Sequence, residues 1–280
     1  MAEYKTDMRF MTRDAIKYLA IVAMTLDHIA YIFLEPQLLT YGDAGVASAE
    51  ALAQANAGVL PSGGCAFLPA LSPATIELFY RLFLCIGTFT GPVMIYFLIE
   101  GYFYTHDVRG YAKRLLLFAL LSQLPFSLAI AGFFGNMLFT LLICLGVLYV
   151  HDHVADGRLQ KILYALLFFV SLFTDWNFLS VPLVLFLRPA FHPATSRFYV
   201  DPAEQRRGML KCVAYFLLVS CLTKGMFEGL TEALGMVLGF ACIACFYNGQ
   251  QATAHRKFHK YFFYIYYPAH LLVLWALHAM

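Results

Sequence analysis

Long apolar stretches interrupted by few charges constrain this chain more than any other feature of its sequence. The first contains the run AIVAMTLDHIAYIFL at residues 20–34. Only 13% of the 280 residues are Asp, Glu, Lys or Arg, whereas about 25% is usual in a soluble domain. The mean hydropathy is +0.69. We therefore predict an all-α fold, a polytopic transmembrane helix bundle.

Nine apolar segments are candidate spans, although several are shorter than the roughly 20 residues that a spanning helix usually needs. Short or broken spans are tolerated where protein or a cavity satisfies the backbone, which hints at an internal site. The second segment contains Gly87, Gly91 and Pro92, and we expect it to bend or break there. We predict a single transmembrane domain over residues 1–280. The segments are residues 14–34, 76–104, 113–133, 138–151, 160–174, 177–188, 209–223, 229–247 and 261–279.

Basic residues gather in alternate connecting segments. All of the 19 Lys and Arg except Arg81 and Lys224 fall on one side of the predicted bundle. The positive-inside rule then places the N-terminal segment 1–13 in the cytoplasm and the C-terminus outside. Residues 35–75 become an external loop, with a short helix near Ala47–Ala57. Residues 188–211 become a basic cytoplasmic loop, which we interpret mainly as a topology signal and alternatively as an anion site.

The seven cysteines predict neither a disulfide framework nor a metal site. Their number is odd and they are scattered along the chain. Cys242 and Cys245 form a C-x-x-C pair whose thiols share a helix face, but no second pair completes a zinc site. Small apolar packing residues are the favoured interpretation, and we predict no metal.

Asp27 and His28 are charged or titratable residues inside the first apolar segment. An Asp at the centre of a spanning helix costs about 2.5–3.5 kcal/mol on insertion scales. Tyr31 follows at helical spacing and extends the same polar stripe. One interpretation is a polar contact between helices. Two adjacent ionisable groups favour a functional site, because His exchanges a proton near neutral pH and a carboxylate tunes its basicity.

Other polar residues also lie in or beside apolar segments. Each one alone is compatible with a helix cap, a snorkelling end or a packing hydrogen bond. His270 is harder to explain in this way, because it lies in the middle of the last segment, just after Tyr267. The others are Glu100, Arg114, Asn136 and Asp175.

The sequence resembles the TraX family of membrane proteins over nearly its whole length. The resemblance implies an integral membrane acetyltransferase of the bacterial inner membrane. The namesake acetylates the N-terminal amine of pilin with acetyl-CoA. TraX proteins are also distantly similar to multi-span acyltransferases of the acyltransferase-3 type, whose first span carries a histidine as proposed base. That role passes to His28, with Asp27 beside it. The matching stretches are TRDAIKYLAIVAMTLDHIAYIF, FLIEGYFYTHDVRGYAKRLLLFALLSQLPF, NMLFTLLICLG, DWNFLSVPLVLF, FYNGQ and YFFYIYYPAHLL.

One stretch departs from the family pattern. The family usually has a Gly-Arg pair before the proline of its second span, whereas this chain reads IGTFTGP with Thr88 at that place. Arg81 lies seven residues earlier, about two helical turns, which is close enough for its side chain to reach the same face.

Acyl transfer needs a base, a hold on the thioester and donors for the developing oxyanion. We predict His28 as the base, oriented by Asp27, with His270, Tyr31 or Asn136 as alternative oxyanion donors. An acetyl group held on His28 is a second possible mechanism. Glu100 is predicted to pair with Arg114 or Lys113; alternatively Glu100 or Asp175 binds the acceptor amine. The predicted partners of the acetyl-CoA phosphates are Arg109, Lys113, Arg114, Arg206 and Arg207.

The acceptor is not defined by the sequence: a peptide amine, a sugar or another small molecule fits. The expected surroundings are membrane lipid, and no nucleic-acid partner is predicted.

The main rival class is a proton-coupled transporter, which uses intramembrane Asp, His and Glu. It predicts internal repeats, which we do not find. A haem protein with His28 and His270 as axial ligands is a third hypothesis.

Overall fold

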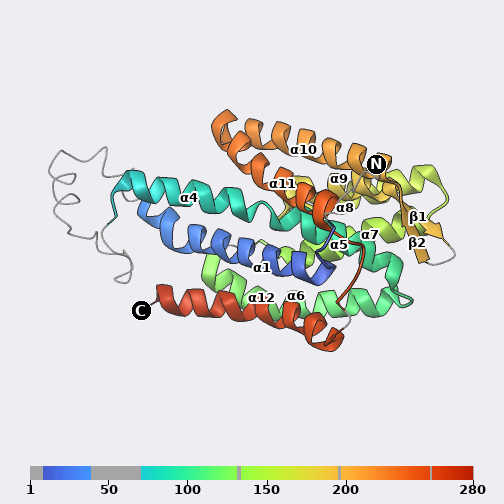
Figure 1. Cartoon of the computed structure of the whole chain (residues 1–280), viewed down its shortest axis with the longest axis horizontal. Coiled ribbons are helices and arrows are strands. Elements are labelled where there is room, and N and C mark those ends of the chain that lie inside the picture. The colour runs from blue at the N-terminus through green and yellow to red at the C-terminus, as the bar shows by residue number, and fades with distance from the viewer. Residues whose placement is uncertain (1–8, 39–70, 131–133, 195–196, 253, 280) are drawn as a thin grey trace, which may run out of the picture.

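The structure, a computed structural model, describes residues 9–38, 71–130, 134–194, 197–252 and 254–279 (Figure 1). The predicted all-α fold is confirmed, with one short β-hairpin added. The helices are α1 (Arg13–Ile29), the π-helical turn η1 (Ala30–Leu34), α4 (Pro73–Gly87), α5 (Thr90–Tyr104), α6 (Val108–Ile130), α7 (Met137–His153), α8 (Gly157–Ser171), α9 (Asn177–Leu187), the 3-10 turn η2 (Arg188–Ala190), α10 (Pro202–Lys224), α11 (Met226–Phe246) and α12 (Arg256–His278). The strands are β1 (Phe191–Ala194) and β2 (Arg197–Val200).

Local sequence signals start several of these helices. Thr12 caps α1, where its hydroxyl accepts a hydrogen bond from the Ala15 amide. Ser72 caps α4 in the same way, and Pro73 occupies the first helical position, where its missing N–H costs nothing. Asn136 caps α7 through its side-chain oxygen, and Asp201 caps α10. Capping side chains satisfy backbone N–H groups that have no partner within the helix.

The second apolar segment is broken, as its glycines and proline predicted. α4 ends at Gly87 and α5 begins at Thr90. α5 is the central helix of the bundle, since most of its residues are buried and it contacts α1, α7, α9 and α11. α1 lies between α4 and α12 (Figure 1). One side of α1 therefore packs against three other helices, α4, α5 and α12.

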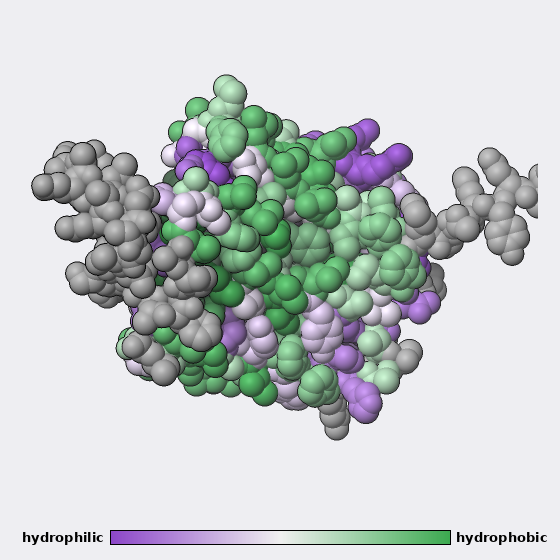
Figure 2. All heavy atoms as spheres, turned by 60° about the vertical axis from the view of Figure 1, so that its left-hand side comes forward, coloured by the Kyte–Doolittle hydropathy of each residue, from purple (hydrophilic) through white to green (hydrophobic). Residues whose placement is uncertain are grey.

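The surface is that of a membrane protein. Four helical segments are long and apolar enough to cross a bilayer: Arg13–Leu38, Pro73–Tyr104, Val108–Ile130 and Met226–Phe246. The segments Met137–His153 and Asn177–Ala190 are apolar but shorter. Figure 2 shows a broad hydrophobic surface on one face, with hydrophilic side chains gathered near its edges. Soluble monomers rarely expose such a continuous apolar area. The count of nine spans and the orientation of the N-terminus stay predictions.

The basic segment 188–211 is more ordered than a loop. Phe191 pairs with Val200 in the antiparallel hairpin of β1 and β2, and α10 begins at Pro202. Arg206 and Arg207 therefore lie on the first turns of α10. The hairpin was not predicted. Most of the predicted external loop, residues 39–70 with the helix near Ala47–Ala57, lies outside the described residues.

Candidate functional site

Two histidines from opposite ends of the chain meet inside the bundle. His28, at the end of α1, and His270, on α12, are 4% and 7% exposed. His28 Nδ1 and His270 Nε2 are 2.8 Å apart, which is hydrogen-bond distance. Tyr266 stacks on the His270 ring with centroids 5.1 Å apart, and Tyr267 packs beside both rings. The pair is thus enclosed by aromatic side chains of α12.

A backbone contact fixes the protons of this pair. His270 Nδ1 lies 3.0 Å from the Tyr266 carbonyl oxygen. A carbonyl only accepts, so Nδ1 of His270 carries the proton and Nε2 of the neutral ring is an acceptor. His28 Nδ1–H must then donate to it. The remaining nitrogen of neutral His28, Nε2, keeps its lone pair, which is the arrangement required of a general base.

The helix changes its pitch directly after His28. The backbone N–H of Ala30 bonds both the Asp27 and Leu26 carbonyls, and residues 30–34 form the π-helical turn η1. Such turns insert one extra residue into a helix and are frequent at functional sites. The turn carries Tyr31, which lines the same cavity as His28. The sequence pattern did not indicate this turn.

His28 lines a cavity of about 670 Å³ whose lining includes both acidic and aromatic side chains. Lys224 also lines it and pairs with the buried Glu232, at 2.7 and 3.0 Å from the two carboxylate oxygens. The apolar lining includes Trp176 and Phe216. Sequence reasoning did not select Lys224 or Glu232, although Lys224 is one of two basic residues outside the topology pattern. The lining carboxylates are Asp27, Glu35, Asp175 and Glu232.

Close backbone contacts position two of these carboxylates. A Cβ atom at Gly87 would overlap the Asp27 side chain, so only glycine lets α4 approach α1 at this point. Asp175 precedes α9, and its amide donates to the Gly135 carbonyl at 2.8 Å. A helix cap was one interpretation of Asp175, but α9 begins at Asn177 and has no side-chain cap. Its carboxylate is exposed to the cavity instead.

The structure therefore gathers Asp27, His28, Tyr31 and Asp175 around one cavity, with His270 and Tyr267 packed behind His28. The expected orienting role of Asp27 is not what the contacts show. Among the described residues, Asp27 has no hydrogen bond to His28, and His270 holds the ring instead.

Two of the three expected oxyanion donors already donate hydrogen bonds to other residues. The Asn136 amide nitrogen donates to the Ala119 carbonyl and to Gln123, and His270 donates to Tyr266. Asn136 is thus a helix cap and a link between α6 and α7. Tyr31 is the candidate whose hydroxyl has no hydrogen-bond partner within the described part of the chain.

Arg81 does not take the place of the family arginine. Its guanidinium bonds Glu77 at 2.8 Å, lies 3.7 Å from Glu228 and covers the Phe227 ring. Arg81 does not line the cavity, whereas Thr88 does. The cation that lines this cavity is Lys224.

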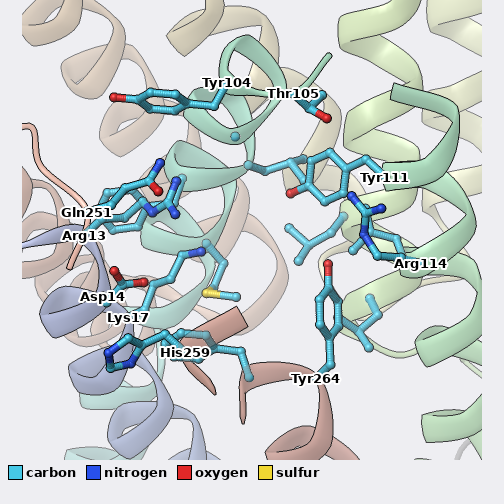
Figure 3. A pocket seen from close by; sticks show the side chains of 18 of the residues that line it. Arg13, Asp14, Lys17, Tyr104, Thr105, Tyr111, Arg114, Gln251, His259 and Tyr264 are labelled. Carbon is cyan, nitrogen blue, oxygen red and sulfur yellow. The ribbon is translucent and has the colours of Figure 1, made fainter. Parts of the chain in front are cut away.

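A second cavity, of about 340 Å³, lies at the opposite end of α1 (Figure 3). Of the five cations predicted to bind acetyl-CoA, only Arg114 lines it. Arg109, Lys113, Arg206 and Arg207 have exposed side chains, and Arg207 pairs with Glu204. Arg13 and Lys17 line this cavity as well. They were interpreted from the sequence as topology signals.

The sequence predicted that Glu100 pairs with Arg114 or Lys113, and the structure shows other partners. Its carboxylate accepts hydrogen bonds from the Tyr247 hydroxyl at 2.7 and 2.8 Å and lies 3.7 Å from Arg13. Glu100 is buried and lines neither cavity. Binding of an acceptor amine at Glu100 is therefore not supported.

The arrangement of the two histidines does not support the haem hypothesis in its simple form. Axial imidazoles must stand about 4 Å apart to hold an iron between them, given metal–nitrogen bonds of about 2 Å. The two rings are joined directly by a 2.8 Å contact.

These features define a helical membrane protein with a buried histidine pair at the wall of an acidic cavity. The chain belongs to the TraX family, whose sequence profile matches residues 12–278. It is also 25% identical over 276 residues to a probable fimbrial assembly protein, FimC of serogroup H1, from Dichelobacter nodosus, and the match covers 92% of each chain. No solved structure matches the chain significantly.

Proposed function

We propose that this protein is a membrane acyltransferase that moves an acetyl group from acetyl-CoA to an amine, with His28 as general base. The observation that carries the proposal is the chain of contacts from the Tyr266 carbonyl through His270 to His28. It leaves Nε2 as the basic nitrogen of His28, a residue that lines the cavity. Membership of the TraX family supports the same reaction.

In the proposed reaction, the acceptor amine attacks the carbonyl carbon of the thioester. A C–N bond forms, and His28 Nε2 takes a proton from the acceptor nitrogen. The C–S bond then breaks, and the leaving thiolate of CoA takes that proton back from His28. Protonated His28 is stabilised by its hydrogen bond to His270 and by the carboxylates of the cavity. The Tyr31 hydroxyl is the proposed donor to the oxyanion.

The charge of the cavity favours an amine over a hydroxyl acceptor. Four carboxylates and one ammonium line it. This potential attracts an ammonium group and raises its local concentration, whereas a sugar hydroxyl gains nothing from it. An ammonium acceptor loses one proton to water before attack, and the reaction then releases one proton per acetyl group in total.

The proposed acceptor is the N-terminal amine of a pilin-type peptide. The namesake of the family acts on pilin, and the Dichelobacter nodosus relative is named as a probable fimbrial assembly protein. We further propose a bacterial inner-membrane location, nine spans and a cytoplasmic N-terminus. In this orientation the cavity with Arg13 and Lys17 opens toward cytoplasmic acetyl-CoA, and the His28 cavity lies toward the opposite side.

The test is acetyl transfer by the full chain in nanodiscs, with labelled acetyl-CoA and a peptide bearing a free N-terminus. We expect wild type and His192→Ala, an exposed histidine on β1, to form acetyl-peptide. His28→Ala should lose transfer while it still binds CoA. Equal turnover by His28→Ala would remove His28 from the chemistry. Absence of CoA binding and of transfer by folded wild type would reject the acyltransferase, and uptake of solute driven by a pH gradient would then favour a transporter.

A further inference from the structure

The cavity at the N-terminal end of α1 collects cations from two helices. Arg13 and Lys17 come from α1, and Arg114 comes from α6. In Figure 3, Arg13 and Lys17 reach into the cavity from one side, and Arg114 faces them with Tyr111 and Tyr264. Asp14 is the carboxylate among the lining residues, and its Oδ2 accepts a hydrogen bond from the Ala252 amide at 2.8 Å. Positive charge therefore exceeds negative charge in the lining.

Part of the donor capacity of these cations is unused. The Nε–H groups of Arg13 and Arg114 are buried and have no hydrogen-bond partner among the described residues. Lys17 has no hydrogen bond or ion pair there either; its ammonium lies over the rings of Phe263 and Phe97, at 5.4 and 5.9 Å. Buried polar groups are nearly always paired. Unused donor groups on three cations around one cavity indicate a missing anionic ligand.

Neighbouring residues hold the cations in place. Glu100, itself bonded by Tyr247, lies 3.7 Å from Arg13. The Arg114 guanidinium lies 5.8 Å from the Tyr111 ring centroid, and Tyr264 lines the cavity beside it. These contacts fix the two guanidinium groups before any ligand binds. Preorganised arginines bind phosphate through paired N–H groups, and lysine adds a point charge.

We propose that this cavity binds the phosphate groups of the acyl-CoA donor; this inference rests on the proposed function. Arg13, Lys17 and Arg114 pair with the phosphates. Tyr111, Tyr264 and His259 supply flat faces against which an adenine ring can stack. A volume of about 340 Å³ holds the phosphate-bearing end of the donor and leaves its thioester arm to extend elsewhere.

The distance to His28 matches the length of that arm. Lys17 and His28 are eleven residues apart on α1, or about 16 Å at 1.5 Å per residue. The pantetheine arm, with two amide groups between phosphate and sulfur, has the backbone length of roughly four extended residues, about 14 Å. Phosphates beside Lys17 therefore place the thioester near His28.

The arm follows the seam between α1 and α12. Along it, the hydroxyls of Thr25 and Tyr266 are 2.9 Å apart, and Phe263 lines the cation cavity. Among the described residues the two cavities share no lining residue. Loading of the donor therefore requires side chains along this seam to move apart.

The test is equilibrium binding of CoA and of 3′,5′-ADP to the full chain in phosphatidylcholine nanodiscs. Lys17→Gln and Arg114→Gln should each weaken binding of both ligands about ten-fold or more, because each removes a charged hydrogen bond to phosphate. Arg114→Lys should recover part of the loss. Arg158→Gln and Lys161→Gln, exposed cations on α8, should change binding less than two-fold, roughly the scale of a surface charge.

Two results would overturn the site. One is a cavity variant that folds, as judged by its thermal transition, and binds CoA as tightly as wild type. The other is a cavity variant that loses binding of inorganic phosphate, or of phosphatidylglycerol added to the nanodisc, but still binds CoA. This result would assign the cavity to a free anion or a lipid headgroup. Neither result contradicts the proposed function, provided that the wild-type protein transfers acetyl. CoA binding that depends on Lys17 and Arg114 without any transfer would instead support the site and reject the function.

Discussion

His28 and His270 are 242 positions apart in the sequence, and their Nδ1 and Nε2 atoms lie 2.8 Å apart in the bundle. The contact joins the first and the last helix of the described chain. Because His270 is itself held by the Tyr266 carbonyl, it acts on His28 as a fixed acceptor. This is the role that a carboxylate plays in hydrolase triads, performed here by a neutral ring.

The first prediction concerns this positioning role. In His270→Phe, His28 loses the acceptor for its Nδ1–H and can carry its proton on either nitrogen. We expect kcat to fall about 100-fold, the lower range of general-base contributions, with KM for the acceptor nearly unchanged. His270→Gln, whose side-chain oxygen can accept from Nδ1–H, should recover part of the activity. Steady-state kinetics over a pH series would measure both.

A purely structural role for His270 would give a different pattern. His270→Phe would then lower the thermal transition of the protein in nanodiscs, with kcat and its pH dependence unchanged per folded molecule. His270→Gln would offer no advantage over His270→Phe.

The second prediction concerns the approach of α4 to α1. Gly87→Ala introduces a Cβ that overlaps the Asp27 Cβ and carboxylate, so α4 must move away from the His28 cavity. Alanine normally favours a helix over glycine by about 1 kcal/mol, and here we expect the opposite sign. Both the thermal transition and acetyl transfer should decrease.

Gly146→Ala on α7 is the matched control. Its added Cβ would meet Leu167 at 3.5 Å, an ordinary contact, so stability should stay equal or rise slightly. Equal behaviour of the two variants would show that α4 can shift without cost and that Gly87 does not hold the Asp27 wall.

Much of the helical architecture could be predicted from the sequence, because apolar runs and caps are local signals. The break between α4 and α5 followed from Gly87, Gly91 and Pro92. Asp27 and His28 stood out because a polar pair in an apolar helix is costly unless it faces the bundle interior. The hairpin β1–β2 was missed, although aromatic and β-branched residues flank its turn. The basic residues of the segment 188–211 led us to interpret the whole segment as a loop.

The contacts within the candidate site could not be predicted. No local pattern indicates that His270 packs on His28, since this depends on how α12 docks against α1. Arg13 and Lys17 fit the topology pattern of the sequence, so nothing in the sequence sets them apart from the other cations. Only the packing of the helices shows that they line a cavity with Arg114. The Lys224–Glu232 pair becomes visible only when α10 and α11 turn at Gly225. Side-chain direction across helices is a tertiary property.

The third prediction tests the charge of the His28 cavity. Asp175→Asn removes one of four carboxylates without changing the size of the side chain. We expect KM for an amine acceptor to rise about two- to ten-fold, the scale of a partly solvated charge interaction, with kcat little changed. The effect should shrink at high salt. Glu204→Gln, on the exposed first turn of α10, is the control and should leave KM unchanged.

A hydroxyl acceptor gives the contrasting result. If Asp175→Asn leaves KM unchanged for the amine peptide while wild type prefers an alcohol acceptor, the acidic cavity does not select an ammonium group and the proposed acceptor class is wrong.

The fourth prediction concerns Arg188, which is 9% exposed and ties η2 to α7. Its guanidinium donates to Asp152 at 2.8 Å and to the Phe191 carbonyl at 2.7 Å, and it covers the Phe103 ring. Arg188→Met keeps much of the apolar contact but removes the hydrogen bonds of Arg188 to Asp152 and to the Phe191 carbonyl. We expect a loss of about 1–3 kcal/mol in the free energy of unfolding.

A double-mutant cycle with Asp152→Asn separates the ion pair from the other contacts of Arg188. If the pair contributes, the two changes together should cost less than the sum of their separate effects. Arg207→Met, which breaks the exposed pair with Glu204, should cost at most about 1 kcal/mol. All variants should keep CoA binding and the His28-dependent transfer per folded molecule, because Arg188 lines neither cavity. An Arg188→Met protein as stable as wild type would show that packing of Phe103 and the hairpin, rather than this guanidinium, holds η2 against α7.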